Sequence, residues 1–382
     1  MQQKKKILLF TDWFEPGFKA GGPIRSCVNF VSHMQTDYRI DVFTSDRDLG
    51  AKEPYAGVEP DRWLSKDAAD VRIYYLSPSQ SAWTTIRRQL KEIDPDFIYL
   101  NSMFSTYYTI YPLLLYRLLG LKGRIVLSPR GMLRDSALQF KPAKKRLFLS
   151  IFRNSGLPGK ISFQAADGTE MEDIKRSFGG SVQVAQIANF PPAFPDQPNR
   201  IEKRPGELEL LFIGRIHPIK NLDYLLEVLN EVSCKIRLTI VGSIEEPSYW
   251  EKCREIIRLL PSNVSVNYAG EVPHHELTPI IARHHIFALP TRGENFGHAI
   301  FEALSLGRPV LISDQTPWRC LTAAKAGWDL PLNEPGLFRK CIGEAGRFDQ
   351  EEFDEWCRSA RTFAQTFIRR SDIKQQYLEL FR

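Results

Sequence analysis

Cysteine is scarce in this chain and is never closely paired. Six cysteines are scattered over 382 residues, with no CxxC or comparable spacing. Zinc knots and disulfide frameworks both need clustered or regularly spaced cysteines. The pattern therefore argues against both and favours a reducing compartment.

Long apolar runs are also lacking. The longest, at residues 110–116 and 147–152, fall well short of the roughly 20 residues that a membrane-spanning helix needs. Lysines 4–6 resemble the start of a signal peptide, but the apolar run that follows, residues 7–10, is too short to complete one. We therefore expect a cytoplasmic protein whose first buried strand is 7–10.

Acidic residues are missing from one long segment. None occurs from Ser136 to Ala166, where basic side chains alternate with apolar ones. Such a pattern is typical of a helix lying on an anionic membrane, so we expect a peripheral protein at the inner face of the membrane. A core helix with a solvated basic face is the alternative. The membrane candidates are Lys141, Lys144, Lys145, Arg146, Phe148 and Arg153.

The charge is unevenly divided between the two halves of the chain. Residues 1–200 hold 28 Lys and Arg against 20 Asp and Glu, whereas residues 201–382 hold 23 against 25. The first half is thus expected to face something anionic. No recognised nucleic-acid-binding module surrounds the basic segment, so we expect no nucleic-acid partner.

What the chain does contain is two series of short apolar runs alternating with helical patterns. Strands are predicted at 7–10, 39–43, 71–75, 97–100 and 124–127, and then at 208–213, 237–241, 264–268, 286–289 and 309–312. Helices are predicted between them, for example at 22–34, 81–92, 222–232 and 248–260. This alternation predicts α/β architecture with two doubly wound parallel sheets.

A proline-rich segment separates the two series. Five prolines fall within residues 189–206, which we interpret as a linker. We expect an N-terminal Rossmann-like domain at 1–195, a second at 206–366, and a C-terminal helix at 367–382 that returns to the first. Ligands of such sheets bind at the carboxyl ends of the strands, so the active site is expected in a cleft where the two domains face each other.

The most informative motif follows the predicted strand 286–289. It sets Glu294 in a loop and Glu302 about two turns into a helix. The unpaired backbone N–H groups near Asn295, Phe296 and Gly297 suit phosphate oxygens, because they begin that helix. Two carboxylates beside such a site would accept hydrogen bonds from sugar hydroxyls, which describes a nucleotide-sugar. Glu302 lies in an apolar run and is expected to have a partner.

A second motif follows the strand 208–213. Gly214 ends the strand, and Arg215 and Lys220 stand in the loop before the next helix. Two cations there would clamp a diphosphate and offset charge on a departing nucleotide. Small or compact residues at other strand ends, Gly242 and Val272 among them, would let a base and ribose approach the backbone.

Taken as a set, these motifs resemble the donor site of the glycosyltransferase 4 family of retaining GT-B glycosyltransferases, over most of residues 208–332. The resemblance implies that Arg215 and Lys220 bind the donor diphosphate, Glu302 the ribose and Glu294 the transferred sugar. It extends more loosely to Gly21 and Gly22 in a first strand-to-helix loop, as further donor contacts. It also implies retention of configuration, no metal and no other cofactor.

The sequence departs from that family at one point. Many members carry a histidine near the end of an N-domain strand, where this chain has Ser128-Pro129-Arg130-Gly131. We interpret this as a subfamily feature in which Arg130 meets a phosphate or an acidic sugar of the acceptor.

Three other patterns carry less weight. The spacing of Gly17 and Gly22 resembles a P-loop but lacks its Lys and Ser or Thr. The pairs His274-His275 and His284-His285 are expected to be ordinary surface or core histidines, and no metal site is expected. Asp94-Pro95-Asp96 precedes its strand, whereas a metal-binding DxD motif would follow one.

The expected function is transfer of a hexose-type sugar from a UDP- or GDP-linked donor to a hydroxyl of a lipid-linked glycan, as in surface-polysaccharide assembly. The domain at 206–366 is expected to bind the nucleotide-sugar, and the basic domain at 1–195 is expected to bind the acceptor. Two alternatives stay open. A nucleotide-sugar epimerase on the same scaffold would convert the donor without an acceptor. A non-catalytic nucleotide-sugar-binding protein would bind the donor without transferring the sugar.

Overall fold

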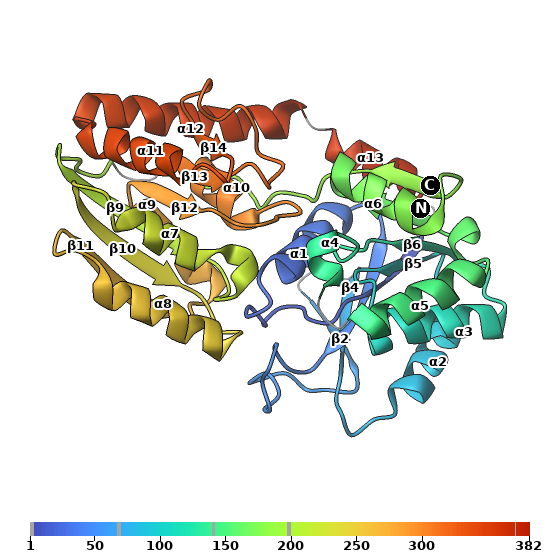
Figure 1. The fold of residues 1–382 in the computed structure, drawn as a ribbon. Coiled ribbons are helices and arrows are strands. Elements are labelled where there is room, and N and C mark those ends of the chain that lie inside the picture. Colours follow the sequence, from blue (N-terminus) through green and yellow to red (C-terminus); the bar gives the residue numbers. More distant parts are fainter. Residues whose placement is uncertain (1–3, 67–69, 140–141, 197–199, 371) are drawn as a thin grey trace. The chain divides into compact units, whose positions relative to one another are not determined.

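The computed structural model describes residues 4–66, 70–139, 142–196, 200–370 and 372–382. The chain forms two compact units (Figure 1). The first comprises Met1–Phe190 with Ile373–Arg382, and the second comprises Pro191–Asp372. Each is a parallel α/β sheet with helices on its faces, as predicted.

Over the described residues, the first unit is built on an eight-stranded sheet in the order β3-β4-β2-β1-β5-β6-β7-β8. The strands pair in parallel except for β3, which is antiparallel to β4. From β1 the chain builds toward β4 on one side and then, from β5, toward β8 on the other. The topological switch point therefore lies between β1 and β5. The strands are β1 (Lys6–Phe10), β2 (Arg39–Ser45), β3 (Trp63–Ser65), β4 (Val71–Leu76), β5 (Phe97–Leu100), β6 (Arg124–Leu127), β7 (Ser162–Ala165) and β8 (Gln183–Gln186).

Helices cover both faces of this sheet. One face packs on α2, α3, α5 and α6 through residues such as Ile86, Leu113 and Phe152. The other packs on α1 and α13, where the ring centroid of Phe30 lies 5.4 Å from that of Tyr377. The helical elements are α1 (Gly22–Met34), α2 (Ala82–Ile93), η1 (Thr106–Ile110), α3 (Tyr111–Leu119), α4 (Asp135–Leu138), α5 (Pro142–Asn154), η2 (Pro158–Lys160), α6 (Gly168–Phe178) and α13 (Ile373–Leu380).

The second unit has, within the part of the chain described, six parallel strands in the order β11-β10-β9-β12-β13-β14. Its switch point lies between β9 and β12. The strands are β9 (Glu207–Ile213), β10 (Lys235–Val241), β11 (Val264–Gly270), β12 (Ile286–Leu289), β13 (Val310–Ser313) and β14 (Gly327–Leu330).

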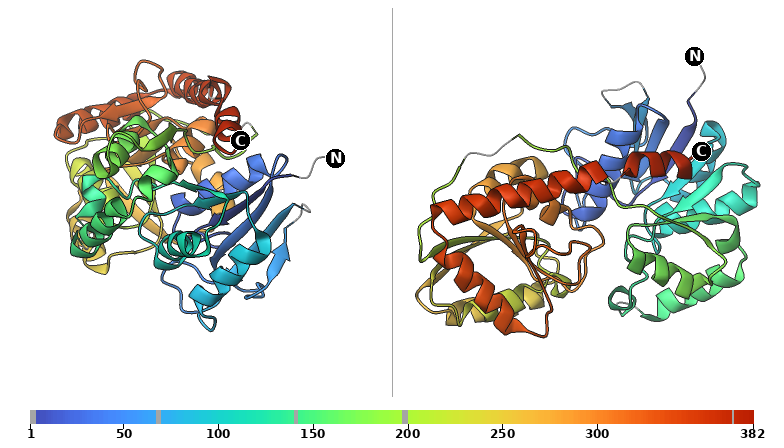
Figure 2. Two further views of the ribbon diagram at one scale, coloured as in Figure 1. Left: turned by 90° about the vertical axis from the view of Figure 1, so that its right-hand side faces the viewer. Right: turned by 90° about the horizontal axis from the view of Figure 1, so that it is seen from above.

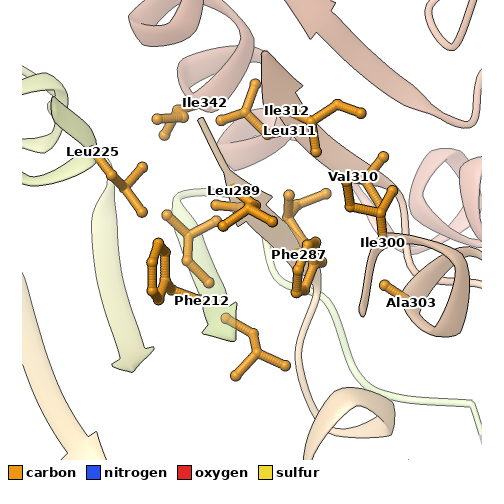
Figure 3. Packing of buried hydrophobic residues seen from close by; sticks show 14 of the residues in the cluster. Phe212, Leu225, Phe287, Leu289, Ile300, Ala303, Val310, Leu311, Ile312 and Ile342 are labelled. Carbon is orange, nitrogen blue, oxygen red and sulfur yellow. The ribbon is translucent and has the colours of Figure 1, made fainter. Parts of the chain in front are cut away.

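The central strand β12 is apolar and buried along its whole length, because helices cover both faces of the sheet there. Phe212, Phe287 and Leu289 pack with α7 and α10 in one continuous core (Figure 3). The helical elements are η3 (Pro218–Lys220), α7 (Leu222–Leu229), α8 (Pro247–Leu259), η4 (His274–Glu276), α9 (Leu277–Ala282), α10 (His298–Ser305), α11 (Pro335–Arg347) and α12 (Gln350–Arg370).

The structure adds elements that the sequence pattern did not predict. The strands β3, β7, β8 and β14 have only three or four residues each, and β7 and β8 carry glutamines rather than an apolar run. The C-terminal stretch also forms two helices rather than one (Figure 2). The segment that joins the first unit therefore begins at Ile373, six residues later than the expected 367.

Candidate functional site

The centre of the candidate site is an ion pair across the switch point of the second sheet. Lys220 follows β9 and Glu294 follows β12, and the Lys220 ammonium donates to Oε1 of Glu294. Their side chains are only 17% and 12% exposed. Because β9 and β12 are neighbours in the sheet, the loops at their carboxyl ends meet, although 74 positions separate the two residues. The structure thus brings together two of the predicted catalytic residues.

Asn221 fastens the two loops to each other. It has a left-handed backbone, with φ of 60°, and is almost fully buried. Its side-chain Nδ2 donates to the Pro290 carbonyl at 3.0 Å, and its Oδ1 accepts from Nε of Arg292 at 3.0 Å. The backbone N–H of Arg292 also donates to the Ile219 carbonyl at 2.7 Å. These bonds fix the position of Lys220 relative to Glu294.

Glycines allow the strand ends beside this pair to approach one another. Gly214 donates to the Val241 carbonyl at 3.0 Å, and Gly242 donates to the Gly270 carbonyl at 2.9 Å. A Cβ at Gly242 would lie 2.0 Å from the Gly214 carbonyl oxygen, a contact that no side chain tolerates. Gly242 is therefore required by the close packing of β9 and β10, whatever it does toward a ligand.

Arg215 is held by a neighbour that the sequence did not reveal. Its guanidinium pairs with Glu245, which follows β10, and both side chains are about one-third exposed. His217, two residues on, accepts from the Ile219 N–H at 3.2 Å and caps η3. Burial lowers the pKa of His217, with the Glu245 charge opposing that shift. Arg215 thus pairs with Glu245, while Lys220 pairs with Glu294.

The segment between Glu294 and α10 is anchored from β13 and the loop that follows it. The Glu294 N–H donates to the Gln315 carbonyl at 3.0 Å, and Nε1 of Trp318 donates to the Phe296 carbonyl at 2.5 Å. Gly297 has φ of 77° and precedes the first residue of α10. Asn295 differs from its neighbours, since both polar atoms of its buried amide have no hydrogen-bond partner among the described residues. An unsatisfied buried amide in a native structure calls for a ligand or water.

Glu302 has the partner that its apolar surroundings required. Nε2 of His274 lies 2.8 Å from Oε1 of Glu302, which is 12% exposed. His274 begins η4, two residues after Val272, whose side chain packs against the core. The neighbouring His275 is 80% exposed. The contact between His274 and Glu302 joins η4 to α10, and the sequence pattern did not reveal it.

The predicted donor contacts in the first unit lie at the start of α1. Gly21 has φ of 64° and is the N-cap of this helix, and Gly22 is its first residue. Nothing in the structure tests their contact with a donor.

Arg130 also has a left-handed backbone, with φ of 56°, and it makes bonds to neutral groups. Its guanidinium donates to the Tyr99 hydroxyl at 2.9 Å, to Asn101 Oδ1 at 3.2 Å through Nε, and to Asn189 Oδ1. No carboxylate of the described residues lies within ion-pair distance of Arg130. Its proposed contact with a phosphate or an acidic sugar stays a prediction.

The membrane candidates on α5 divide between its two faces. Lys144, Arg146 and Arg153 are exposed, whereas Lys145 donates to the Ala137 carbonyl at 2.7 Å. Phe148 is packed against Phe104 and Phe152, with ring centroids 5.8 and 5.7 Å away, and so does not face outward as expected. The apolar residues that do face outward are Leu147 and Ile151, 64% and 61% exposed. Lys141 lies outside the described residues.

The described residues contain no group of three or more His, Cys, Asp or Glu side chains placed to hold a metal ion. None of their helices combines the length and hydrophobicity that crossing a membrane requires.

Part of the second unit matches a known protein family. Residues 207–343 match the family model described as glycosyl transferases group 1. A D-inositol 3-phosphate glycosyltransferase of Rhodococcus erythropolis is 30% identical over 120 residues, which are 29% of this chain and 26% of that protein. An uncharacterized 41.2 kDa protein in the cps region of Klebsiella pneumoniae is 22% identical over 80% of this chain and 84% of its own. The chain thus matches about a quarter of the first relative's length.

Solved structures resemble the whole chain. A sucrose-phosphate synthase of Thermosynechococcus elongatus has a TM-score of 0.72 at 14% identity, covering 99% of this chain and 98% of its own. Anabaena HepE, in complex with UDP and glucose, has a TM-score of 0.66 at 16% identity, covering 98% of both. WaaG, a glycosyltransferase involved in lipopolysaccharide biosynthesis, has the same TM-score at 13% identity and the same coverage. These likenesses establish the GT-B fold and, with the family match, support a GT-B glycosyltransferase.

Asn221 offers a direct test of how the site is assembled. Asn221→Ala should lower the free energy of unfolding by about 2–3 kcal/mol, because it removes two buried hydrogen bonds and puts alanine at a positive φ. Asn221→Gly should lose less, since glycine accepts that φ. The measurement is urea unfolding followed by circular dichroism.

The control is Asn230→Ala at the exposed end of α7, which should change the stability by no more than about 0.5 kcal/mol. Equal stabilities for Asn221→Ala and Asn230→Ala would contradict the role given to Asn221.

Proposed function

We propose that this protein is a retaining GT-B glycosyltransferase. It moves a hexose-type sugar from a UDP- or GDP-linked donor to a hydroxyl of a lipid-linked glycan in surface-polysaccharide assembly. The observation that carries the proposal is the partly buried Lys220–Glu294 pair at the switch point of the second sheet, with Glu302 on the helix that follows.

The ion pair gives each partner a role when the donor binds. Lys220 exchanges its bond with Glu294 for the donor diphosphate, whose negative charge grows as the bond from the sugar to the phosphate breaks. Glu294 then accepts hydrogen bonds from hydroxyls of the transferred sugar. Arg215 makes the corresponding exchange, leaving Glu245 for a phosphate oxygen. The two cations stabilise the leaving group without a metal or other cofactor.

Glu302 and His274 suit the ribose of the donor. A carboxylate accepts hydrogen bonds from both ribose hydroxyls when its orientation is fixed. His274 supplies that orientation by holding Oε1, which leaves Oε2 and the remaining lone pairs for the sugar. The unsatisfied amide of Asn295 offers both a donor and an acceptor beside Glu294.

The similar proteins support the donor and the pathway of this proposal. HepE was solved with UDP and glucose, which is the kind of donor proposed. WaaG is described as involved in lipopolysaccharide biosynthesis, and the Klebsiella relative lies in a cps region. Retention of configuration rests on the family resemblance of the motifs.

Lys220→Ala and Glu294→Ala test the catalytic assignment. Each should lower the rate of sugar transfer by about 100-fold or more, because charge developing on the leaving group loses its preorganised partner or the sugar loses its anchor. The assay follows release of UDP or GDP from a panel of nucleotide-sugars, with a lipid-linked glycan extract as the acceptor.

Lys235→Ala is the matched control. Lys235 forms an ion pair with Glu207 at the amino ends of β10 and β9, away from the loops that hold Lys220 and Glu294. The parent rate in either site variant would overturn the assignment. Conversion of the donor without an acceptor would indicate the epimerase instead, and binding without turnover would indicate the non-catalytic protein.

His274→Ala and His275→Ala separate the positioning of Glu302 from a general effect of histidine removal. His274→Ala should raise the KM for the donor about tenfold with a smaller effect on kcat, because Glu302 loses its orientation. His275→Ala should behave as the parent, since its ring is exposed. Equal KM values for the two variants would remove His274 from the site. His274→Gln, which keeps a donor, should recover part of the loss.

A second helix, α3, extends the membrane surface proposed from α5. Helices α3 and α5 cover the same face of the first sheet, and Nη1 of Arg117 on α3 donates to the Ser155 carbonyl just beyond α5 at 3.2 Å. On α3, Leu114 and Leu118 are 50% and 68% exposed. Leu147 and Ile151 are exposed apolar residues of α5, and Lys144, Arg146 and Arg153 are exposed bases of the same helix. Such a surface suits an anionic bilayer that holds a lipid-linked acceptor.

Vesicle binding tests this surface. Lys144→Glu with Arg146→Glu should lower co-sedimentation with vesicles of anionic phospholipid by more than about tenfold at moderate salt, since each basic residue contributes about 1 kcal/mol. Leu147→Ser with Ile151→Ser should also weaken binding, with less dependence on salt.

Arg283→Glu with Lys340→Glu, two exposed positions of the second unit, makes the same change in net charge and should leave binding nearly intact. Absence of binding by the parent protein, or equal losses in the site and control variants, would exclude the surface.

A further inference from the structure

The first unit contains a cavity that the assignments above do not use. Its volume is about 500 Å³. It lies at the carboxyl ends of β1, β2 and β4 and against η1, which follows β5. It therefore occupies the switch point of the first sheet, where ligands of doubly wound folds bind. A volume of this size is in the range of small-molecule sites.

Aromatic side chains form much of its wall. Trp13 follows β1, Trp83 begins α2, and Tyr107 and Tyr111 come from η1 and α3. The rings of Trp83 and Tyr111 meet edge to face with centroids 5.2 Å apart, and Tyr107 lies 5.6 Å from Tyr111. Tyr107 is half exposed, so the aromatic wall continues to the surface of the unit. These rings offer flat apolar faces and, in the tyrosines, hydroxyl groups.

The polar part of the cavity carries a carboxylate and a neutralised cation. Oδ1 of Asp12 accepts from the Ser105 hydroxyl at 2.7 Å, which joins the loops after β1 and β5. Burial raises the pKa of Asp12, although hydroxyls of Ser105 and Ser102 oppose that shift. Arg47 is bonded to Asp46 through Nε at 2.8 Å and Nη2 at 3.1 Å.

The charges of the lining limit what the cavity can bind. Among its described lining residues Arg47 is the one cation, and it is already matched by Asp46. A phosphate or nucleotide would meet the Asp12 carboxylate. Drawing Arg47 away to offset that repulsion would leave Asp46, whose side chain is only 3% exposed, as a buried charge without its cation. A molecule with an apolar face and several hydroxyls fits both the rings and the carboxylate.

We propose that this cavity binds an uncharged hexose ring of the acceptor glycan, with a face of the ring on Trp83 or Trp13 and hydroxyls donating to Asp12. The inference rests on the proposed function, because it names the chemical class of the acceptor. The sugar, and not the lipid or a phosphate, is then the part of the acceptor recognised by this cavity.

Binding of the sugar is measured without turnover. Methyl glycosides of glucose, galactose and N-acetylglucosamine are titrated against the full-length protein by saturation-transfer NMR, with inorganic phosphate and UDP as comparison probes. At least one glycoside should show a saturation-transfer signal with the parent protein. Trp83→Ala and Asp12→Asn should each abolish this signal. Trp83→Phe, which keeps a ring, should retain it. UDP binding, which the proposed function places in the second unit, should be unchanged in all three variants. Circular dichroism matching that of the parent shows that the variants are folded.

A second measurement uses the transferase reaction. Trp83→Ala should raise the KM for the glycan acceptor by about tenfold or more, with the donor KM unchanged. A parent-like acceptor KM in an active enzyme, or glycoside signals that persist in Trp83→Ala, would overturn the cavity assignment and leave the proposed function standing. Glycoside binding that depends on Trp83, in a protein that transfers no sugar, would uphold the cavity and overturn the proposed function.

Discussion

The parallel pairing of β9 with β12 is the constraint on which the candidate site depends. It brings Lys220 and Glu294 together from loops that are far apart in the chain, and Asn221 fastens those loops. A partly buried ion pair is weak support for stability, because desolvating two charges offsets much of their attraction. Its position at the switch point, next in sequence to the unsatisfied amide of Asn295, suits the proposed ligand that takes over both partners.

The two candidate sites both lie at the switch point of a sheet, but the chemistry of their side chains differs. In each, the loops on either side of the switch point are joined by a polar contact: Asp12 with Ser105 in the first, Lys220 with Glu294 in the second. The surroundings then differ. Aromatic rings line the first site, and the one cation of its described lining is bonded to the buried Asp46. The second site has two cations, each paired with a carboxylate that is partly exposed. This contrast suits an uncharged sugar in one unit and a charged nucleotide-sugar in the other.

In helix α5, packing decides which of the apolar residues predicted to meet a membrane are exposed. The absence of acids and the mixture of basic and apolar residues indicated a membrane helix, and Phe148 was among its expected contacts. In the structure Phe148 packs between Phe104 and Phe152. Leu147 and Ile151, four positions apart and therefore on one face, are exposed instead. Which apolar side chains cover the core depends on how the helix sits on the sheet, and that orientation is a tertiary property.

The local pattern of the chain determined much of the fold and the location of the donor-type motifs. Strand β12 and helix α1 have the bounds predicted for them, because an apolar run closed by proline and a periodic helix opened by glycine are readable over a few residues. The same holds for the placement of Glu294 before α10 and of Lys220 before α7. A short polar strand such as β8 could not be predicted in this way, because it is stabilised by pairing with β7 rather than by its own side chains.

Only the tertiary structure decided which groups meet. It placed His274 on Glu302, Glu245 on Arg215 and Asn221 between two loops, and it enclosed an aromatic cavity around Asp12. The contacts of Arg215 and Asn221 join the ends of strands that are neighbours in the sheet but distant in sequence, whereas the contact of His274 joins η4 to α10. The order of strands in a sheet results from many weak long-range packing and pairing terms, which leave no periodic signal in the chain itself.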